Sequence, residues 1–259
     1  MTELLRIEVL KIRTTRATYG LLACGAALTS LVAILRASRA GNGHTAPLST
    51  TTGLTTVLTA VGFGLVLATV FGVTVSSGEF RHGTATSTYL ATPNRARVMI
   101  AKLVAGAGFG LVFGALAFGV TCCVGLGFAA AGNDGVALSA LTILGYGGGT
   151  VLACGALAAV GVALGTLVRS QIAAVAGVFI WSIFAETIVG GVFNGIGPFL
   201  PFTAADTMAG ARLGSGGFGF SGSWSASPLP FVAATGLLVA VAVTLAATAA
   251  HTTLKTDIT

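Results

Sequence analysis

The sequence predicts an all-α integral membrane protein with six transmembrane helices. Of its 259 residues, 54% are apolar and only 8% are charged, which leaves too few polar groups to cover the surface of a soluble domain of this size. Apolar stretches also recur with the length of about 20 residues that a spanning helix needs. We therefore treat residues 1–259 as a single transmembrane domain.

Six spans can be placed in order along the chain. Five are built on uncharged apolar stretches, and the other contains one acid, Glu186. Most of the 38 glycines fall within these stretches, where they allow neighbouring helices to approach closely. The expected spans are residues 17–36, 54–77, 103–131, 137–168, 171–193 and 229–251.

The positions of Lys and Arg predict the orientation, because short cytoplasmic loops carry the excess of positive charge. With the N-terminus inside, ten of the 13 basic residues lie on the cytoplasmic side, and only Arg36, Arg39 and Arg212 lie outside. Both termini are therefore expected in the cytoplasm. Attraction to anionic lipid explains the net charge of +6, so no nucleic-acid partner is expected.

Two cytoplasmic segments have helical character. Residues 1–16 alternate apolar and charged positions at helical spacing, which predicts an amphipathic helix on the membrane surface; an ordinary basic flank of the first span is the alternative. Residues 78–102, between spans 2 and 3, form a long charged segment that Pro93 divides. We expect a short coupling helix there, which a partner could grip to move both spans together.

The outer segment 194–228 is long, weakly charged and rich in apolar residues. Backbone of this kind at membrane depth must be covered by protein or line a water-filled cavity, and Pro198 and Pro201 interrupt regular helix. We expect short re-entrant helices over residues 194–213, followed by a Gly/Ser-rich loop. A surface loop bearing aromatic residues is the alternative.

Glu186 is the one acid inside a predicted span. An ionisable side chain at the membrane centre costs about 3 kcal/mol on insertion scales and is a functional candidate. It could bind a cationic substrate, remain neutral with a raised pKa, or form a structural or gating hydrogen bond with the re-entrant segment. We favour the hydrogen bond.

No catalytic, nucleotide or metal site is expected in this chain. The sequence has no G-x-x-x-x-G-K-[ST] motif with which to cradle nucleotide phosphates. No nucleophile is paired with any of the three histidines, and the four cysteines lack metal-ligating partners at useful spacing. If ATP drives this protein, another chain must supply the ATP site.

The motif at the start of the coupling segment resembles a known family. An acid–aromatic–Arg–x–Gly–Thr sequence after span 2, then a Pro, basic residues and a Lys at span 3, is similar to the membrane subunits of ABC-2 type ABC transporters, which are bacterial export permeases with six spans. Glu8 and Lys11, before span 1, resemble that family's connecting helix. The residues that match the motif are Glu79, Phe80, Arg81, Gly83, Thr84, Pro93, Arg95 and Lys102.

The resemblance implies the permease subunit of an ATP-driven exporter in the bacterial plasma (inner) membrane, working by alternating access. It implies a second permease copy, expected as a homodimer, and a pair of ABC ATPase subunits that carry ATP and Mg; membrane lipids are the remaining partners. Glu79 and Arg81 are expected at the docking surface or bracing it. The alternative is that they are ordinary charges at the end of span 2.

Two further expectations concern the substrate and the competing function. Spans rich in Ala, Val, Leu, Gly and Phe favour an amphipathic or lipophilic substrate, such as a drug, an antibiotic or a lipid. The alternative function is a secondary transporter or channel without an ATPase partner. Such proteins usually place several ionisable groups near the membrane midplane, whereas the predicted spans contain one acid.

Overall fold

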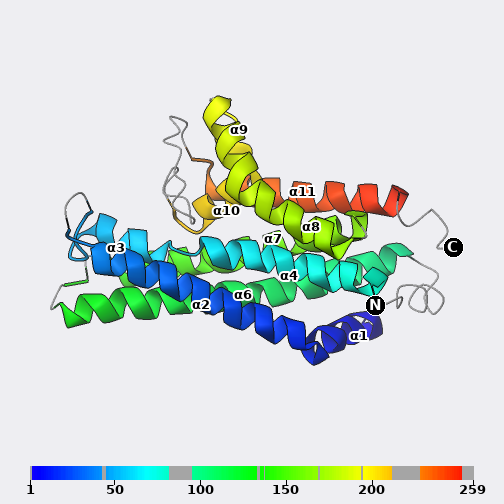
Figure 1. Ribbon diagram of the computed structural model, residues 1–259, viewed down its shortest axis with the longest axis horizontal. Coiled ribbons are helices and arrows are strands. Elements are labelled where there is room, and N and C mark those ends of the chain that lie inside the picture. Colours follow the sequence, from blue (N-terminus) through cyan, green and yellow to red (C-terminus); the bar gives the residue numbers. More distant parts are fainter. Residues whose placement is uncertain are drawn as a thin grey trace.

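The chain forms a bundle of long helices that lie side by side along one axis (Figure 1). The computed structural model describes residues 2–42, 45–81, 95–132, 135–136, 138–168, 170–193, 195–211 and 228–252. Within these residues the secondary structure is helical throughout. Six of the described helical segments are long and apolar enough to cross a membrane. The predicted all-α class with six spans is therefore confirmed.

The helices follow the predicted order. They are α1 (Thr2–Thr14), α2 (Arg16–Arg39), α3 (Thr51–Leu58), α4 (Gly62–Arg81), α6 (Arg95–Ala131), α7 (Ala140–Val168), α8 (Gln171–Ile180), the π-helix η1 (Trp181–Ala185), α9 (Glu186–Val192), the 3-10 turn η2 (Gly197–Phe199), α10 (Pro201–Met208) and α11 (Phe231–Thr252).

The second span is interrupted. The sequence predicts a continuous helix over residues 54–77, but α3 and α4 are separated by residues 59–61. Thr121 of α6 donates its hydroxyl to the carbonyl oxygen of Leu58 at 3.0 Å. A neighbouring helix thus satisfies a carbonyl at the break, which is how interrupted helices are tolerated at membrane depth.

The third and fifth spans also differ from the expected helices. α6 begins at Arg95 rather than at residue 103 and has 37 residues, so it is about 55 Å long and exceeds the hydrocarbon thickness of a bilayer. The last part of the predicted coupling segment is therefore continuous with span 3. In the fifth span, η1 separates α8 from α9, and α9 projects away from the bundle (Figure 1).

The most buried span includes α4, which packs closely against α7 and also contacts α6 and α2. Gly72 of α4 faces the carbonyl of Ala158, and Gly161 of α7 faces the carbonyl of Thr69. A Cβ atom at either glycine would overlap the opposing oxygen. The two backbones can therefore lie this close only because both positions are glycine, as is common between membrane helices.

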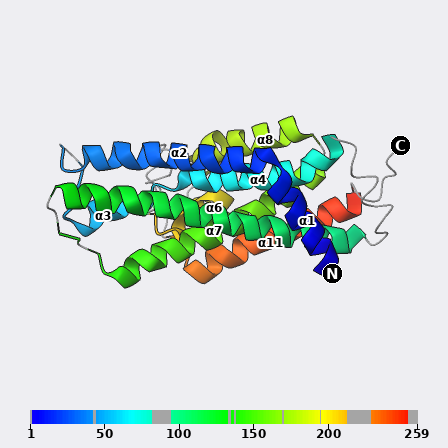
Figure 2. The same ribbon diagram turned by 90° about the horizontal axis from the view of Figure 1, so that it is seen from below.

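One end of the bundle gathers several elements that are distant in the sequence. Figure 2 shows α1 crossing this end beside the start of α6, with the end of α11 nearby. At the opposite end lie α3, the end of α2 and the end of α6 (Figure 2). Short α10 packs against α7 and α11 after the fifth span. The crossing of α1 over the helix ends positions the site described next.

Candidate functional site

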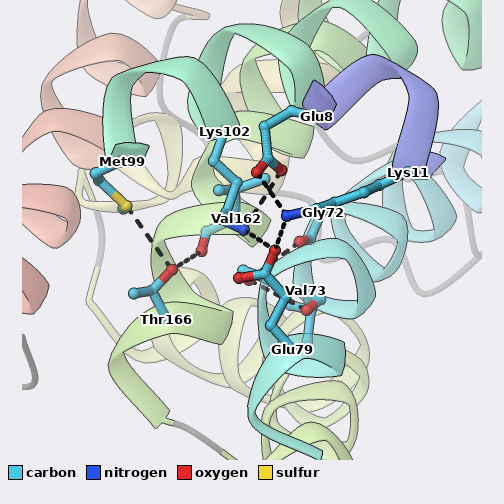
Figure 3. Close-up of polar contacts among 10 residues, drawn as sticks. Glu8, Lys11, Gly72, Val73, Glu79, Met99, Lys102, Val162 and Thr166 are labelled. Atoms are coloured by element: carbon cyan, nitrogen blue, oxygen red, sulfur yellow. Dashed lines mark hydrogen bonds and ion pairs between the residues drawn. The ribbon is translucent and has the colours of Figure 1, made fainter. Parts of the chain in front are cut away.

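Four charged side chains from three helices meet where α1 crosses α4 and α6 (Figure 3). Lys11 of α1 donates to Glu79 Oε1 of α4 at 2.9 Å and to Glu8 Oε1 at 3.1 Å. The Lys102 Nζ of α6 lies 2.6 Å from Glu79 Oε1 and 3.4 Å from Glu8 Oε2. Each lysine therefore bridges both carboxylates. We refer to these four residues as the charged cluster.

The charged cluster is buried except at Lys11. The exposed fraction of the side chain is 3% for Lys102, 5% for Glu8 and 10% for Glu79, against 40% for Lys11. Two acids and two lysines sum to zero charge, which is the condition under which charges are tolerated away from water. Loss of a single member would leave an uncompensated buried charge. The cluster therefore fixes the three helices relative to one another.

Lys11 is held in its charged form. Partial burial lowers its pKa, but the hydrogen bond and the charge of Glu79, followed by those of Glu8, outweigh this effect. The pKa of Lys11 is consequently raised above the ordinary lysine value. The ammonium stays protonated at neutral pH, so the charged cluster keeps its balance there.

The amphipathic character of α1 brings its charges to this position. Glu8 and Ile12 are the buried residues of the helix, and Lys11 lies one turn after Glu8 on the same face. Thr18 of α2 donates its hydroxyl to the carbonyl of Ile12 at 3.0 Å. This hydrogen bond spans the junction between α1 and α2, and the charged cluster attaches α1 to α4 and α6.

The structure brings together four of the residues singled out in the sequence: Glu8, Lys11, Glu79 and Lys102. The other residues of the motif are Phe80, Arg81, Gly83, Thr84, Pro93 and Arg95. Three of these belong to the ends of α4 and α6, where the backbone is described but the side chains are not. The remaining three, with the expected coupling helix, fall in residues 82–94, outside the described residues.

Comparison with models of known protein families identifies the family of this chain. A family model for the ABC-2 family transporter protein matches residues 4–185, which is more than two thirds of the chain and includes the whole charged cluster. The chain belongs to the ABC-2 family. No curated protein matches it. Family membership and the six apolar helices make it a multi-pass membrane protein, the membrane component of an ABC transporter.

This ABC-2 family member also holds a buried acid outside the charged cluster, Glu186, whose side chain receives four hydrogen bonds. Glu186 Oε1 accepts from Trp181 Nε1 at 3.1 Å and from the backbone N–H of Phe202 at 2.8 Å. Its Oε2 accepts from the backbone N–H and the hydroxyl of Thr203, both at 3.0 Å. Because the first N–H groups of a helix lack intrahelical partners, Glu186 acts as a cap for α10.

The contacts of Glu186 connect span 5 to the segment that follows it. A hydrogen bond to this segment, one of the roles considered from the sequence, is present in the structure. The π-helical turn η1 lies directly before Glu186, and such turns often occur at functional positions. Sequence reasoning did not name Phe202 and Thr203 as the partners. The only local signal was Pro201, a residue favoured at the first position of a helix.

The chemistry of the charged cluster suits positioning rather than catalysis. It contains ammonium and carboxylate groups that neutralise one another, with no hydroxyl or thiol nucleophile among the four. Among the described residues, no group of three or more His, Cys, Asp or Glu side chains is placed to hold a metal ion. What the arrangement can do is transmit a displacement of one helix end to the other two.

Proposed function

We propose that this chain is the permease subunit of an ATP-driven ABC exporter in the plasma membrane of a bacterium. A separate ABC ATPase subunit binds and hydrolyses ATP with Mg, and it docks at the end of the bundle where α1 crosses α4 and α6. The observation that carries the proposal is the charged cluster, in a chain of the ABC-2 family. A partner that pushes on this end displaces three helices as a unit.

The link between the ATPase and the spans is short. Residues 82–94 join α4, which holds Glu79 in its last turn, to α6, which holds Lys102 about two turns after its start. A force on this connection reaches Glu79 and Lys102, which are 2.6 Å apart, and passes through Lys11 and Glu8 to α1. Since Glu79 is largely buried, its role is to brace the docking surface from inside rather than to touch the partner.

Charge distribution supports a cytoplasmic location for this end. The α1 end carries Arg6, Arg13 and Arg16 as well as Lys11, whereas the charges on the opposite end of α2 are limited to Arg36 and Arg39. Excess positive charge marks the cytoplasmic side of a membrane protein. The proposed orientation places both chain termini in the cytoplasm, where the ATPase is available to dock.

The proposal includes two permease copies and an amphipathic or lipophilic substrate moved by alternating access. Span 5 has an exposed apolar face, where Ile180, Phe184 and Ile188 are each 60% exposed. Such a face favours contact with an apolar neighbour. A second copy of the chain or lipid can cover this face. The spans contain little charge beyond the two sites described, which favours an apolar cargo over a hydrophilic ion.

Co-purification tests the docking role. A partner carrying a P-loop is expected to purify with the wild-type chain and to be lost with Glu79→Arg, because a third positive charge in the cluster repels both lysines. Glu3→Arg is the matched control, since Glu3 is an exposed acid on α1. Each variant is checked for a monodisperse elution profile first. Retention of the partner by well-folded Glu79→Arg would contradict the bracing role.

A further inference from the structure

A cavity of about 500 Å³ opens beside the charged cluster, between α1, α2, α4 and α8. Its charged lining groups are Glu8, Lys11 and Glu79, and Ile12 and Val75 contribute to an apolar wall. The uncharged polar side chains that also line it are Thr15, Thr18, Thr74 and Gln171. The volume lies within the range of about 300–1,000 Å³ that is usual for small-molecule sites. We call it the interfacial cavity, because it lies at the level where amphipathic α1 meets the ends of the spans.

Two polar groups at this cavity retain hydrogen-bonding capacity. An ammonium group has three N–H donors, and Lys11 uses two of them, on Glu8 and Glu79. Both lysines approach Glu79 at Oε1, and within the described part of the chain no hydrogen bond reaches its Oε2. Since Oε1 lies 2.9 Å from Lys11 Nζ, the spare donor and the spare acceptor are close neighbours.

A ligand that matches this pair carries a cation and an anion a short distance apart. The charged cluster is neutral overall, so it exerts little net attraction on a purely anionic or purely cationic group. The apolar wall of the cavity favours a molecule whose polar head continues into hydrocarbon. A zwitterionic phospholipid of the leaflet that α1 contacts has all of these properties.

We propose that the interfacial cavity binds the headgroup of a phospholipid that bears an ethanolamine group. The ammonium donates to Glu79 Oε2, the phosphate accepts from Lys11, and the first acyl carbons lie against Ile12 and Val75. The bound lipid thus adds contacts to the charged cluster that links the three helices. The site uses only this chain's own residues, so it does not depend on the proposed exporter function.

Lipids with choline and ethanolamine headgroups differ in their ability to donate the proposed hydrogen bond to Glu79. A choline nitrogen is fully methylated and has no N–H to donate to Glu79 Oε2, while the phosphate and acyl chains are unchanged. Loss of a hydrogen bond to a charged group corresponds to about tenfold weaker binding or more. A phosphatidylglycerol headgroup also lacks the ammonium, and it tests whether the phosphate alone suffices.

Native mass spectrometry of the full-length chain in detergent measures the lipid directly. Titration with phosphatidylethanolamine, phosphatidylcholine and phosphatidylglycerol of identical acyl chains is expected to give about tenfold tighter binding of the first. Soluble glycerophosphoethanolamine, which lacks acyl chains, is expected to bind far more weakly than the intact lipid. Equal affinities for the ethanolamine and choline lipids would overturn the proposal. Equal binding of glycerophosphoethanolamine would overturn the assignment of the ligand as a lipid.

A cavity-filling variant locates the site without touching a charge. Gly78 lines the interfacial cavity, and a Cβ there meets no atom within 4 Å, so Gly78→Leu is expected to occupy the space and abolish the ethanolamine preference. Gly119→Leu is the matched control, because Gly119 of α6 is also open to a Cβ and lies outside the cavity. An unchanged lipid preference in Gly78→Leu would refute the location. If Gly78→Leu does not fold, the comparison of lipids on the wild type still decides the proposal.

Discussion

Replacement of Lys102 by Met is predicted to destabilise the protein strongly. Lys102 has the least exposed side chain of the charged cluster, at 3%, and Met keeps most of its volume, so little of the effect comes from a cavity. Its loss leaves Glu8 and Glu79 with Lys11 alone and a net buried charge. Removal of one partner of a buried ion pair costs about 3–5 kcal/mol.

The expected loss can be read as a change in unfolding temperature. For a chain of this size each kcal/mol corresponds to about 2–4 °C, so Lys102→Met should unfold about 6–20 °C below the wild type. Thermal unfolding in one detergent, followed by fluorescence, measures this difference. Arg13→Met is the control, because Arg13 is an exposed cation on α1, and it should change the unfolding temperature little.

A double variant separates charge balance from packing. Glu79→Gln combined with Lys102→Met removes one charge of each sign and leaves the pair of Lys11 and Glu8, whose atoms are 3.1 Å apart. We expect the double variant to lose less stability than the sum of the two single variants, with a coupling of about 0.5–3 kcal/mol. Additive losses, or a Lys102→Met variant as stable as Arg13→Met, would refute the account of the charged cluster.

Three further variants test other parts of the structure. Glu186→Gln replaces an acceptor oxygen with an amide donor facing the N–H groups of α10, so it should cost about 1–3 kcal/mol; an unfolding temperature equal to that of exposed Glu3→Gln would show that Glu186 does not hold α10. Gly161→Ala places a Cβ against the carbonyl of Thr69 and should lower the unfolding temperature by several degrees. The control Gly148→Ala, with no atom within 4 Å of its Cβ, should leave the unfolding temperature unchanged or slightly raised. Equal effects of the two variants would contradict the close packing of α4 and α7. The pKa of Lys11 is raised in the folded chain, so the stabilisation by its charge is complete below the ordinary lysine pKa and is lost as pH rises through the folded value. The stability difference between wild type and Lys11→Met should therefore stay constant from neutral pH to mildly alkaline pH and shrink only in strongly alkaline solution. A difference that shrinks near neutral pH would contradict this.

The sequence predicted the class and order of the helices because length and apolar content determine what can cross a membrane. It did not predict the break at residues 59–61, since the expected span over residues 54–77 contains neither a charge nor a proline to mark an interruption. The carbonyl of Leu58 at the end of α3 is satisfied by Thr121, a residue of another span. A contact between two spans has no counterpart in the local pattern of either one.

The members of the charged cluster were found individually, but their pairing was not predicted. Glu79 ends one span and Lys102 begins the next, so antiparallel spans place opposite charges at one level; this signal could have paired them. The contacts of Glu8 with Lys102 depend on the angle at which α1 crosses the bundle, which no sequence pattern sets. Two of the four hydrogen bonds to Glu186 come from backbone N–H groups, which every residue but proline possesses.

The central claim is that this ABC-2 chain works with a separate ATPase. The most direct test is a mild-detergent pull-down of the full-length chain, expressed with its neighbouring genes, followed by measurement of subunit composition and ATP hydrolysis. We predict a stoichiometric nucleotide-binding partner and vanadate-sensitive ATPase activity in the purified complex. A chain that purifies alone in several detergents, with no associated ATPase activity, would contradict the account and favour a secondary transporter or channel.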